Sequence, residues 1–479
     1  MPTERPGPTE DPKPAGIWPQ AVLDLLGAGG ERPVFEHGER IVGAAEMASL
    51  VRRIAAGLGR AGIGTGDGVA LRLGVTPEAF AATMAAFAVG ARVHGLRPGL
   101  TPAQIEGLLR RDDAVLVDDA RLAELVATPD DGRPLTAGGR PGDVARVIYT
   151  SGSTGDPKGC AQTYAAMSAG WTARPDRWPP AVAELAPRLG RHLVFGSLSS
   201  QVMIEYAVVS LAAGGTLVAA DGPVFPDAVV RHRATSSVIT VGRLHGLIRA
   251  QRTKPSDLSS LRALVVSGSP LDPGRLSEAL EVLGPIVFHG YGQTEAGLIA
   301  MVTPGEMLAS PAALASVGRP PAVNDVRIRD GELYVRTPAQ AQGYWRDPDE
   351  TAQVFTDGWI RTRDLAEQDD DGYLRLLGRT RDVIIVSANL VYAGPIERVL
   401  ASDPAVAEAY VVGRPDDVTG EAVHAFVVAA PGRVPDPDEL RRAVAARLGE
   451  AAVPQTITPI DHVPLAPSGK PDKQALVSS

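Results

Sequence analysis

The stretch that decides the fold is YTSGSTGDPKG, residues Tyr149–Gly159. It combines hydroxyl side chains and glycines with one lysine, Lys158, and the residues before it, 145–148, predict a short strand. Gly152 and Gly155 allow backbone N–H groups to turn inward, and the lysine adds a positive charge, so the segment predicts a phosphate-binding loop that follows a strand. The alternative is a Gly/Ser linker, which needs neither the strand nor the lysine. The loop is not of the Walker A type, because no Ser or Thr follows the lysine.

The composition sets broad limits on the class of protein. The chain has 479 residues, of which 44% are hydrophobic and 22% charged, as in a globular protein that is too long for one core. A net charge of −9 without a long basic patch argues against nucleic acid as a partner. The one cysteine, Cys160, excludes a disulfide framework and is interpreted as a packing residue. Only five of the 47 basic residues are lysines, which draws attention to Lys158 and Lys470.

The N-terminal residues and the most apolar stretches bear on where the protein resides. Residues 1–15 are Pro-rich and polar, lack the apolar core of a signal peptide and predict a disordered tail. The most apolar stretches are too short or too Gly-interrupted to cross a bilayer, so we expect a cytoplasmic protein with no membrane partner. The sequence leaves an oligomer possible.

Helix and strand patterns alternate from about residue 17 to 375. This order predicts an α/β fold with parallel sheets wrapped by helices, in which ligands bind at the carboxyl ends of strands. The expected helices are Ala45–Arg60, Pro77–Gly90, Ile204–Ala213 and Leu276–Leu283. The expected strands are Val69–Leu73, Val115–Val117, Leu193–Phe195, Thr216–Val218, Ser237–Val241, Ala263–Ser267 and Ile286–His289.

From Asp369 the pattern changes to a turn, a basic cluster and short strands at Val383–Val386, Ala409–Val412 and His424–Val428. A helix is expected at Asp438–Leu448, started by Asp436-Pro437. We therefore expect a large N-terminal multi-sheet α/β domain at 16–378, a hinge at 379–382, and a small mobile α+β domain at 383–479.

Four further segments carry candidate chemistry. In HGYGQTE, His289–Glu295, glycines flank a tyrosine whose exposed ring would stack on adenine, and Glu295 could hold Mg²⁺. In FTDGWIRTRDL, Asp364 could accept hydrogen bonds from both ribose hydroxyls. GRTRD offers Arg379, and PLAPSGK places Lys470 on a turn. Taken singly, HGYGQTE is better explained as a strand end with a capping Thr-Glu, Asp364 is equally compatible with a turn or cap, and the Gly-Lys pair at Lys470 carries no signal.

Together and in this order, these segments resemble the adenylate-forming superfamily, which includes acyl-CoA synthetases, luciferases and peptide-synthetase adenylation domains. The resemblance runs from about Pro33 to Leu476. TSGSTGDPKG resembles the phosphate loop, SGSPL and YGQTE the adenine and magnesium segments, and PLAPSGK the segment of the C-terminal catalytic lysine. GELYVRTPAQAQGYW, RTRDL and GYLRLLGRTRD match the ribose and hinge region.

The resemblance implies a role for each matched residue. Lys470, Thr294 and Glu295 would be catalytic, and Glu295 would also be the metal ligand. ATP or AMP would be bound by Thr150, Ser151, Gly152, Ser153, Thr154, Gly155, Lys158, Gly268, Ser269, Pro270, Tyr291, Gly292, Asp364 and Arg379. Arg381 and Asp382 would form the hinge, and Ala388 would line the coenzyme A tunnel. The acyl pocket would comprise Ser200, Gln201, His289 and Gly290.

The implied activity is that of an acyl-CoA ligase that uses ATP, Mg²⁺ and coenzyme A to convert a small-molecule carboxylic acid to its thioester through an acyl-adenylate. No aspartate lies near Ser197–Ser200 to pair with an ammonium group, so we expect a fatty, aryl or polycyclic acid rather than an amino acid. Glu205, the one charge nearby, is interpreted as a solvent-facing helix residue.

Some positions depart from the family pattern: Tyr164 replaces a histidine, Arg363 a glycine before the ribose aspartate, and Ala388 a tunnel glycine. These departures leave two alternatives open. The protein could be a family member that performs only one half-reaction with a partner enzyme, or a non-catalytic relative that binds acyl groups or nucleotides.

Overall fold

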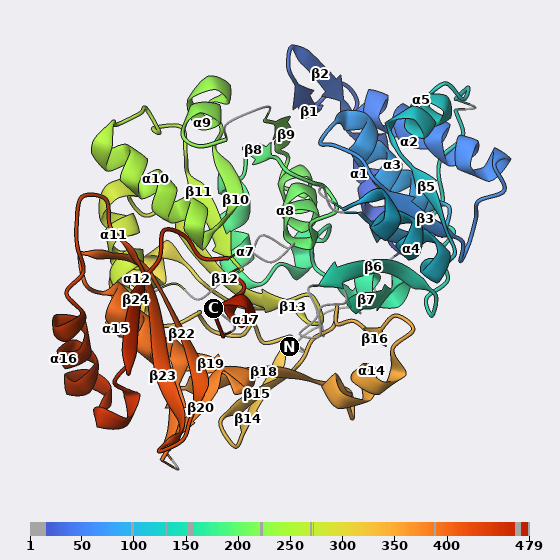
Figure 1. Cartoon of the computed structure of the whole chain (residues 1–479). Coiled ribbons are helices and arrows are strands. Elements are labelled where there is room, and N and C mark those ends of the chain that lie inside the picture. Colours follow the sequence, from blue (N-terminus) through green and yellow to red (C-terminus); the bar gives the residue numbers. More distant parts are fainter. Residues whose placement is uncertain are drawn as a thin grey trace, which may run out of the picture.

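The computed structural model describes residues 16–96, 100–130, 132–150, 158–220, 224–268, 271, 273–387, 389–464 and 471–477. Four sheets organise this part of the chain (Figure 1). Strands β1–β9, within residues 33–219, are blue to green, the last strands of the eight-stranded sheet are yellow, and the C-terminal sheet is orange to red at the lower left. No helix in the described residues is long and apolar enough to cross a membrane.

The largest sheet has eight strands in the order β13-β12-β11-β10-β8-β9-β1-β2. Its central strands are parallel, whereas the edge pairs β12–β13 and β1–β2 are antiparallel. The bounds are β1 Pro33–His37, β2 Arg40–Gly43, β8 Arg191–Val194, β9 Thr216–Ala219, β10 Ser236–Thr240, β11 Ala263–Ser267, β12 Val287–Gln293 and β13 Gly297–Val302.

The second sheet has six strands in the order β16-β7-β6-β4-β3-β5. Strand β6 runs directly into the predicted phosphate loop, and β7 leaves it antiparallel to β6, with Thr150 opposite Lys158. The bounds are β3 Gly68–Leu71, β4 Arg92–Gly95, β5 Ala114–Val117, β6 Val144–Thr150, β7 Lys158–Thr163 and β16 Gly343–Tyr344.

The third sheet corrects the expectation of parallel sheets, because every pair in it is antiparallel. Its order is β14-β15-β18-β17, with β19 paired to β18. Short hairpin connections favour antiparallel pairing, since a parallel pair needs a long crossover. The bounds are β14 Asp325–Arg329, β15 Glu332–Arg336, β17 Phe355–Thr356, β18 Trp359–Gln368 and β19 Leu374–Arg379.

A fourth sheet begins after the 3₁₀ turn Thr380–Asp382 and has the order β21-β20-β23-β22, with β24 paired to β23. It packs on helices α15 and α16 around its own apolar cluster. Asp436 caps α16 by accepting from two backbone N–H groups, as the Asp-Pro signal predicts. The bounds are β20 Val383–Val386, β21 Asn389–Tyr392, β22 Val406–Asp416, β23 Gly420–Ala429, β24 Thr456–Pro459, α15 Ala393–Ala401 and α16 Pro437–Leu448.

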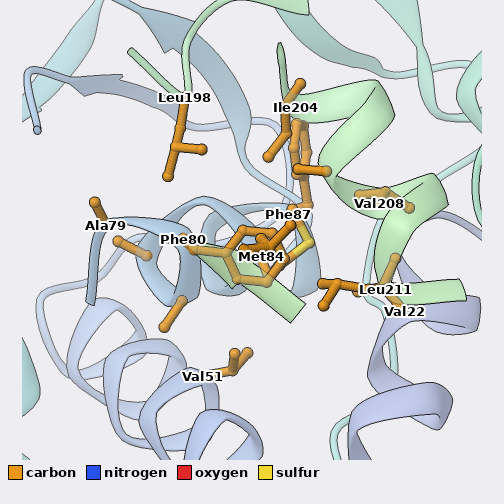
Figure 2. Packing of buried hydrophobic residues seen from close by; sticks show 14 of the residues in the cluster. Val22, Val51, Ala79, Phe80, Met84, Phe87, Leu198, Ile204, Val208 and Leu211 are labelled. Carbon is orange, nitrogen blue, oxygen red and sulfur yellow. The ribbon is translucent and has the colours of Figure 1, made fainter. Parts of the chain in front are cut away.

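The main core lies between the first two sheets, where α3 is buried on almost every side. Figure 2 shows Phe80, Met84 and Phe87 of α3 packed between Val51 of α2 and the aliphatic side chains of α8. The remaining helices are α1 Gln20–Ala28, α2 Ala44–Arg60, α3 Pro77–Ala88, α4 Pro102–Asp112, α5 Asp119–Val126, α6 Tyr164–Ala169, α7 Pro180–Leu185, α8 Gln201–Ala212, α9 Asp227–His232, α10 Val241–Thr253, α11 Pro273–Leu283, α12 Pro304–Ala309, α13 Pro311–Leu314, α14 Pro348–Val354 and α17 Lys473–Val477.

Candidate functional site

Asp364 is the centre of a buried hydrogen-bonded cluster. The Tyr291 hydroxyl donates to its Oδ2 at 2.6 Å and the Gln293 amide donates to the same oxygen at 2.7 Å. Arg379 Nε lies 3.0 Å from Oδ1. A carboxylate offers about four acceptor positions, and three are therefore used. The cluster brings three of the predicted nucleotide contacts together, and Arg379 would have to share Oδ1 with a ribose hydroxyl.

Tyr291 does not present an exposed ring. The residue is 9% exposed, and burial together with the neighbouring Asp364 raises the pKa of its phenol well above the usual value. The expectation of a solvent-exposed stacking platform is therefore wrong, and the hydroxyl acts as a donor that orients Asp364. Gly292 allows β12 to approach β13 closely, since a Cβ there would lie 2.4 Å from the carbonyl oxygen of Gly297.

Glu295 and Lys158 both lie next to the side chain of Tyr344. The Tyr344 hydroxyl donates to Glu295 Oε1 at 2.7 Å, and Lys158 Nζ lies 5.9 Å from the centre of the Tyr344 ring. Burial and the adjacent Glu295 raise the pKa of the Tyr344 phenol, which keeps it a donor. Strand β16, which carries this tyrosine, pairs with β7 opposite Cys160. The predicted metal ligand and the predicted phosphate lysine thus belong to one site.

Glu350 on α14 holds the phosphate-loop lysine. Its Oε1 lies 2.7 Å from Lys158 Nζ and 2.9 Å from Arg363 NH1. Burial alone would raise the pKa of the Glu350 carboxyl, but the two cations outweigh burial and leave it below the usual value. Arg363 adopts a φ of 60°, in the left-handed region that favours glycine. The position that departs from the family glycine is therefore strained locally and joined to the phosphate lysine through one carboxylate.

The residues on either side of the Lys470 segment are hydrogen-bonded to each other, and one of them pairs with the predicted hinge. The Asp472 N–H donates to the Pro464 carbonyl at 2.7 Å. Lys473 Nζ lies 2.7 Å from Glu397 of α15 and 3.4 Å from Asp382. Lys470 itself lies outside the described residues, but its flanking residues are fixed to the C-terminal sheet and to the predicted hinge.

A cavity of about 660 Å³ adjoins this site, because Ala296, the neighbour of Glu295, is in its wall. Most of its lining is apolar or aromatic, including Phe87, Trp171 and Trp178. Gln201, predicted for the acyl pocket, lines the cavity. Ser200 is exposed and caps α8, while His289 and Gly290 are buried in β12, and none of these three is in the wall.

Glu205 is placed differently from the sequence interpretation. It lines the same cavity, and its Oε1 forms an ion pair with Arg146 NH2 at 2.8 Å. Its interpretation as a solvent-facing helix residue is wrong because the facing strand supplies a buried arginine. Cys160 is buried as expected, and burial raises the pKa of its thiol.

Several predicted residues lie outside the described part of the chain, or their side chains do. The backbone of Thr150 ends β6, Gly268 follows β11 with a φ of 95°, and Thr294 lies in the turn before Glu295. Arg381 and Asp382 lie in the 3₁₀ turn between the third and fourth sheets. The residues outside the described ranges are Ser151, Gly152, Ser153, Thr154, Gly155, Ser269, Pro270, Ala388 and Lys470.

Sequence reasoning missed three residues that position the others. Gln293 holds Asp364, Tyr344 holds Glu295, and Glu350 holds Lys158. Tyr344 lies within the GYW signature that was matched as a block, so that signature could have identified it. No local pattern marks Glu350, because its partner lies far away in the sequence.

Comparisons with known proteins agree with this geometry. Residues 27–345 match the AMP-binding enzyme family, and residues 395–470 match the AMP-binding enzyme C-terminal domain. A medium/long-chain-fatty-acid–CoA ligase of Mycobacterium tuberculosis is 33% identical over 72% of this chain, and the match spans 63% of that protein, less than two thirds of its length. A feruloyl-CoA synthase of an Amycolatopsis species is 32% identical over 91% of this chain and 93% of its own.

The amide bond synthetase McbA from Marinactinospora thermotolerans has a similar solved structure, with a TM-score of 0.84 and 35% identity over 95% of this chain and 98% of its own. The two family matches, the relatives and the fold agree with the assembled site. This chain therefore belongs to the AMP-binding enzyme family of the adenylate-forming superfamily.

Proposed function

We propose that this enzyme is an ATP-dependent acyl-CoA ligase that activates an apolar carboxylic acid as its acyl-adenylate and transfers the acyl group to coenzyme A. One observation carries the proposal. Ala296, the neighbour of Glu295, lies in the wall of a largely apolar cavity, Tyr344 joins Glu295 to Lys158, and Gln293, two residues before Glu295, donates to Asp364. Groups suited to phosphate and ribose thus adjoin space suited to an acid's carbon skeleton.

In the first step a carboxylate oxygen bonds to the α-phosphorus of ATP, and the bond to pyrophosphate breaks. Lys158 would stabilise the departing charge, and Asp364 with Arg379 would hold the ribose. The adenine would lie against Gly268–Pro270 and the Tyr291–Gly292 backbone. Lys470 would neutralise the carboxylate and α-phosphate as they approach, since two anions otherwise repel.

The residues present fit a magnesium ion that is bound mainly by substrate. No group of three His, Cys, Asp or Glu side chains suited to a metal occurs within the described ranges. Mg²⁺ usually takes one or two carboxylates together with substrate phosphates, and Glu295 would supply that carboxylate. The ion would neutralise phosphate charge.

In the second step the thiol sulfur of coenzyme A bonds to the acyl carbon, AMP leaves with the former carboxylate oxygen, and the thiol proton is released. We propose that the C-terminal domain, 383–479, rotates about 379–382 to remove Lys470 and admit the thiol past Ala388. The change of sheet at Thr380–Asp382 and the Lys473–Asp382 pair support a boundary there.

A second candidate acceptor is an amine, which would give an amide instead of a thioester. The observation that favours it is the similarity over nearly the whole chain to an amide bond synthetase. The adenylation step is common to both candidates, so the acceptor alone distinguishes them.

The test is a screen of carboxylic acids with ATP and Mg²⁺, with coenzyme A and a primary amine supplied as competing acceptors, read for pyrophosphate and, by mass spectrometry, for acyl-adenylate, thioester and amide. We expect acid-dependent pyrophosphate release, and a thioester when coenzyme A is added. Asp364→Asn should lower pyrophosphate release, whereas the matched control Asp325→Asn, an exposed aspartate in β14, should not. Amide without thioester would select the second candidate, and pyrophosphate release with no acid would contradict both.

A further inference from the structure

The wall of the proposed acyl cavity is largely apolar and contains one largely buried pair of opposite charges. Among its charged lining residues, Asp176 and Arg177 belong to an exposed 3₁₀ turn, whereas Arg146 and Glu205 are enclosed. The side chain of Arg146 is 9% exposed and that of Glu205 is 21% exposed. Burying two charges costs free energy unless their hydrogen bonds are satisfied, so the contacts of this pair decide what the cavity accepts.

The pair is held from three elements. Arg146 on β6 donates from Nε to Gln162 on β7 at 2.7 Å and from NH2 to Glu205 Oε1 on α8 at 2.8 Å. Gln201, one turn before Glu205, donates to the same Oε1 at 3.0 Å. The Gln162 amide in turn donates to the Ala339 carbonyl. The geometry is therefore fixed independently of any substrate.

Two hydrogen-bond acceptor atoms in the cluster formed by Arg146, Gln162, Gln201 and Glu205 remain unused. Glu205 Oε2 and Gln201 Oε1 receive no hydrogen bond from any described residue, and both residues line the cavity. An apolar acid that filled the cavity would strip water from the Glu205 carboxylate without replacing its hydrogen bond. An acid that carries an N–H or O–H group at this depth would satisfy it. The ion pair is neutral overall, which favours a neutral donor over an ammonium group.

The strand register places the cluster along the substrate. Lys158 and Gln162 both lie on β7, four residues apart and on the same face, and Arg146 is directly opposite Gln162. Four residues of strand span about 13 Å. The cluster therefore lies well away from the lysine expected to hold the departing pyrophosphate, and the donor belongs on the part of the acid that fills the cavity.

We propose that Glu205, held by Arg146 and Gln201, recognises a neutral N–H or O–H group on the distal part of an aromatic acid. This inference rests on the proposed function and narrows its substrate class. The aromatic preference comes from the side chains of Trp171, Trp178 and Phe87 in the wall, which offer flat surfaces to a ring.

The experiment compares matched acids that differ only in the donor. The pairs are 4-hydroxycinnamate with cinnamate, and indole-6-carboxylate with benzofuran-6-carboxylate, each measured as kcat/KM for pyrophosphate release. We expect the wild-type enzyme to favour the donor-bearing member at least tenfold, because the other leaves a buried carboxylate unpaired. Glu205→Gln should bring this ratio to within about threefold of unity, since its amide presents a donor as well as an acceptor.

A double variant, Arg146→Leu with Glu205→Leu, removes the pair without leaving a lone charge, and thermal melting reports whether it folds. It should reverse the preference towards cinnamate and benzofuran-6-carboxylate. The matched control is Arg336→Gln with Asp325→Asn, an exposed ion pair between β14 and β15, which should retain the wild-type ratio.

The outcomes separate this inference from the proposed function. Equal turnover within each pair by the wild-type enzyme, or a preference that survives Glu205→Gln, would overturn the role of Glu205. Turnover of fatty acids but of none of the four aromatic acids would overturn the aromatic class. Absence of acid-dependent pyrophosphate release with every acid would count against the proposed function itself.

Discussion

Replacing Arg363 by glycine should weaken the use of ATP without unfolding the protein. Arg363 and Lys158 share Glu350 Oε1, at 2.9 and 2.7 Å. When Lys158 turns to the phosphates of ATP, Arg363 still compensates the Glu350 carboxylate, which is only 14% exposed. Without Arg363, the negative charge of Glu350 would have no cation beside it once Lys158 moved to the phosphates. Breaking the Lys158–Glu350 ion pair would therefore cost more free energy.

The effect on stability should be small because opposing contributions are similar. Relief of the left-handed backbone at Arg363 stabilises by about 1–2 kcal/mol. The greater freedom of glycine in the unfolded chain costs about 0.4–1 kcal/mol, and the lost ion pair about 0.2–1 kcal/mol. The free energy of unfolding should therefore change by between a loss of about 1 kcal/mol and a gain of about 1.4 kcal/mol. The cost to ATP use should be about 1 kcal/mol, a factor of about five in KM for ATP.

The assay is pyrophosphate release as a function of ATP at saturating acid, with thioester formation as a function of coenzyme A measured in parallel. Arg363→Gly should raise KM for ATP and leave the coenzyme A dependence unchanged. Arg233→Gly is the matched control, since this exposed arginine also has a positive φ, 47°, and lies at the end of α9. An unchanged KM for ATP, or an equal change in both dependences, would refute the reasoning.

Three further outcomes are expected. Ala388→Gly should change the coenzyme A dependence of thioester formation by about five- to tenfold and leave the ATP dependence alone, and the reverse pattern would contradict its tunnel role. Tyr291→Phe should lower kcat/KM for ATP by about tenfold, because Asp364 loses the donor that orients it; an unchanged ATP titration would contradict this. Burial lowers the pKa of His192 to about 3, so the unfolded state binds the extra proton below pH 6.5 and stability should fall by about 1.4 kcal/mol at pH 5.5. Denaturant titrations should show this loss in the wild-type protein and a flatter pH dependence in His192→Leu, and equal slopes would contradict it.

The sequence predicted the elements that have strong local signals. The amphipathic pattern of α2, the Asp-Pro start of α16 and the apolar runs of β10 and β11 appear within two residues of their expected bounds. The antiparallel third sheet was missed, because its strands mix charged and apolar residues and pair through short turns that periodicity alone does not orient.

In the candidate site, too, residues with a local sequence signal were predicted, whereas contacts between distant segments were not. Motifs identified Asp364 and Glu295, since their neighbours along the chain carry the signature. Their partners come from segments distant in sequence: Tyr291 reaches Asp364 across 73 residues, and Tyr344 reaches Glu295 across 49. The Arg146–Glu205 pair was missed for this reason, because its two members lie 59 residues apart, on β6 and α8.

The central claim is that one enzyme first makes an acyl-adenylate with the help of Lys470 and then uses it without that lysine. The most direct test measures the two half-reactions of Lys470→Ala separately. Acid-dependent pyrophosphate release should fall by about a hundredfold or more, as expected when an electrostatic contact in the transition state is lost, while thioester formation from a preformed acyl-adenylate should change little. Equal losses in the two half-reactions would contradict the account.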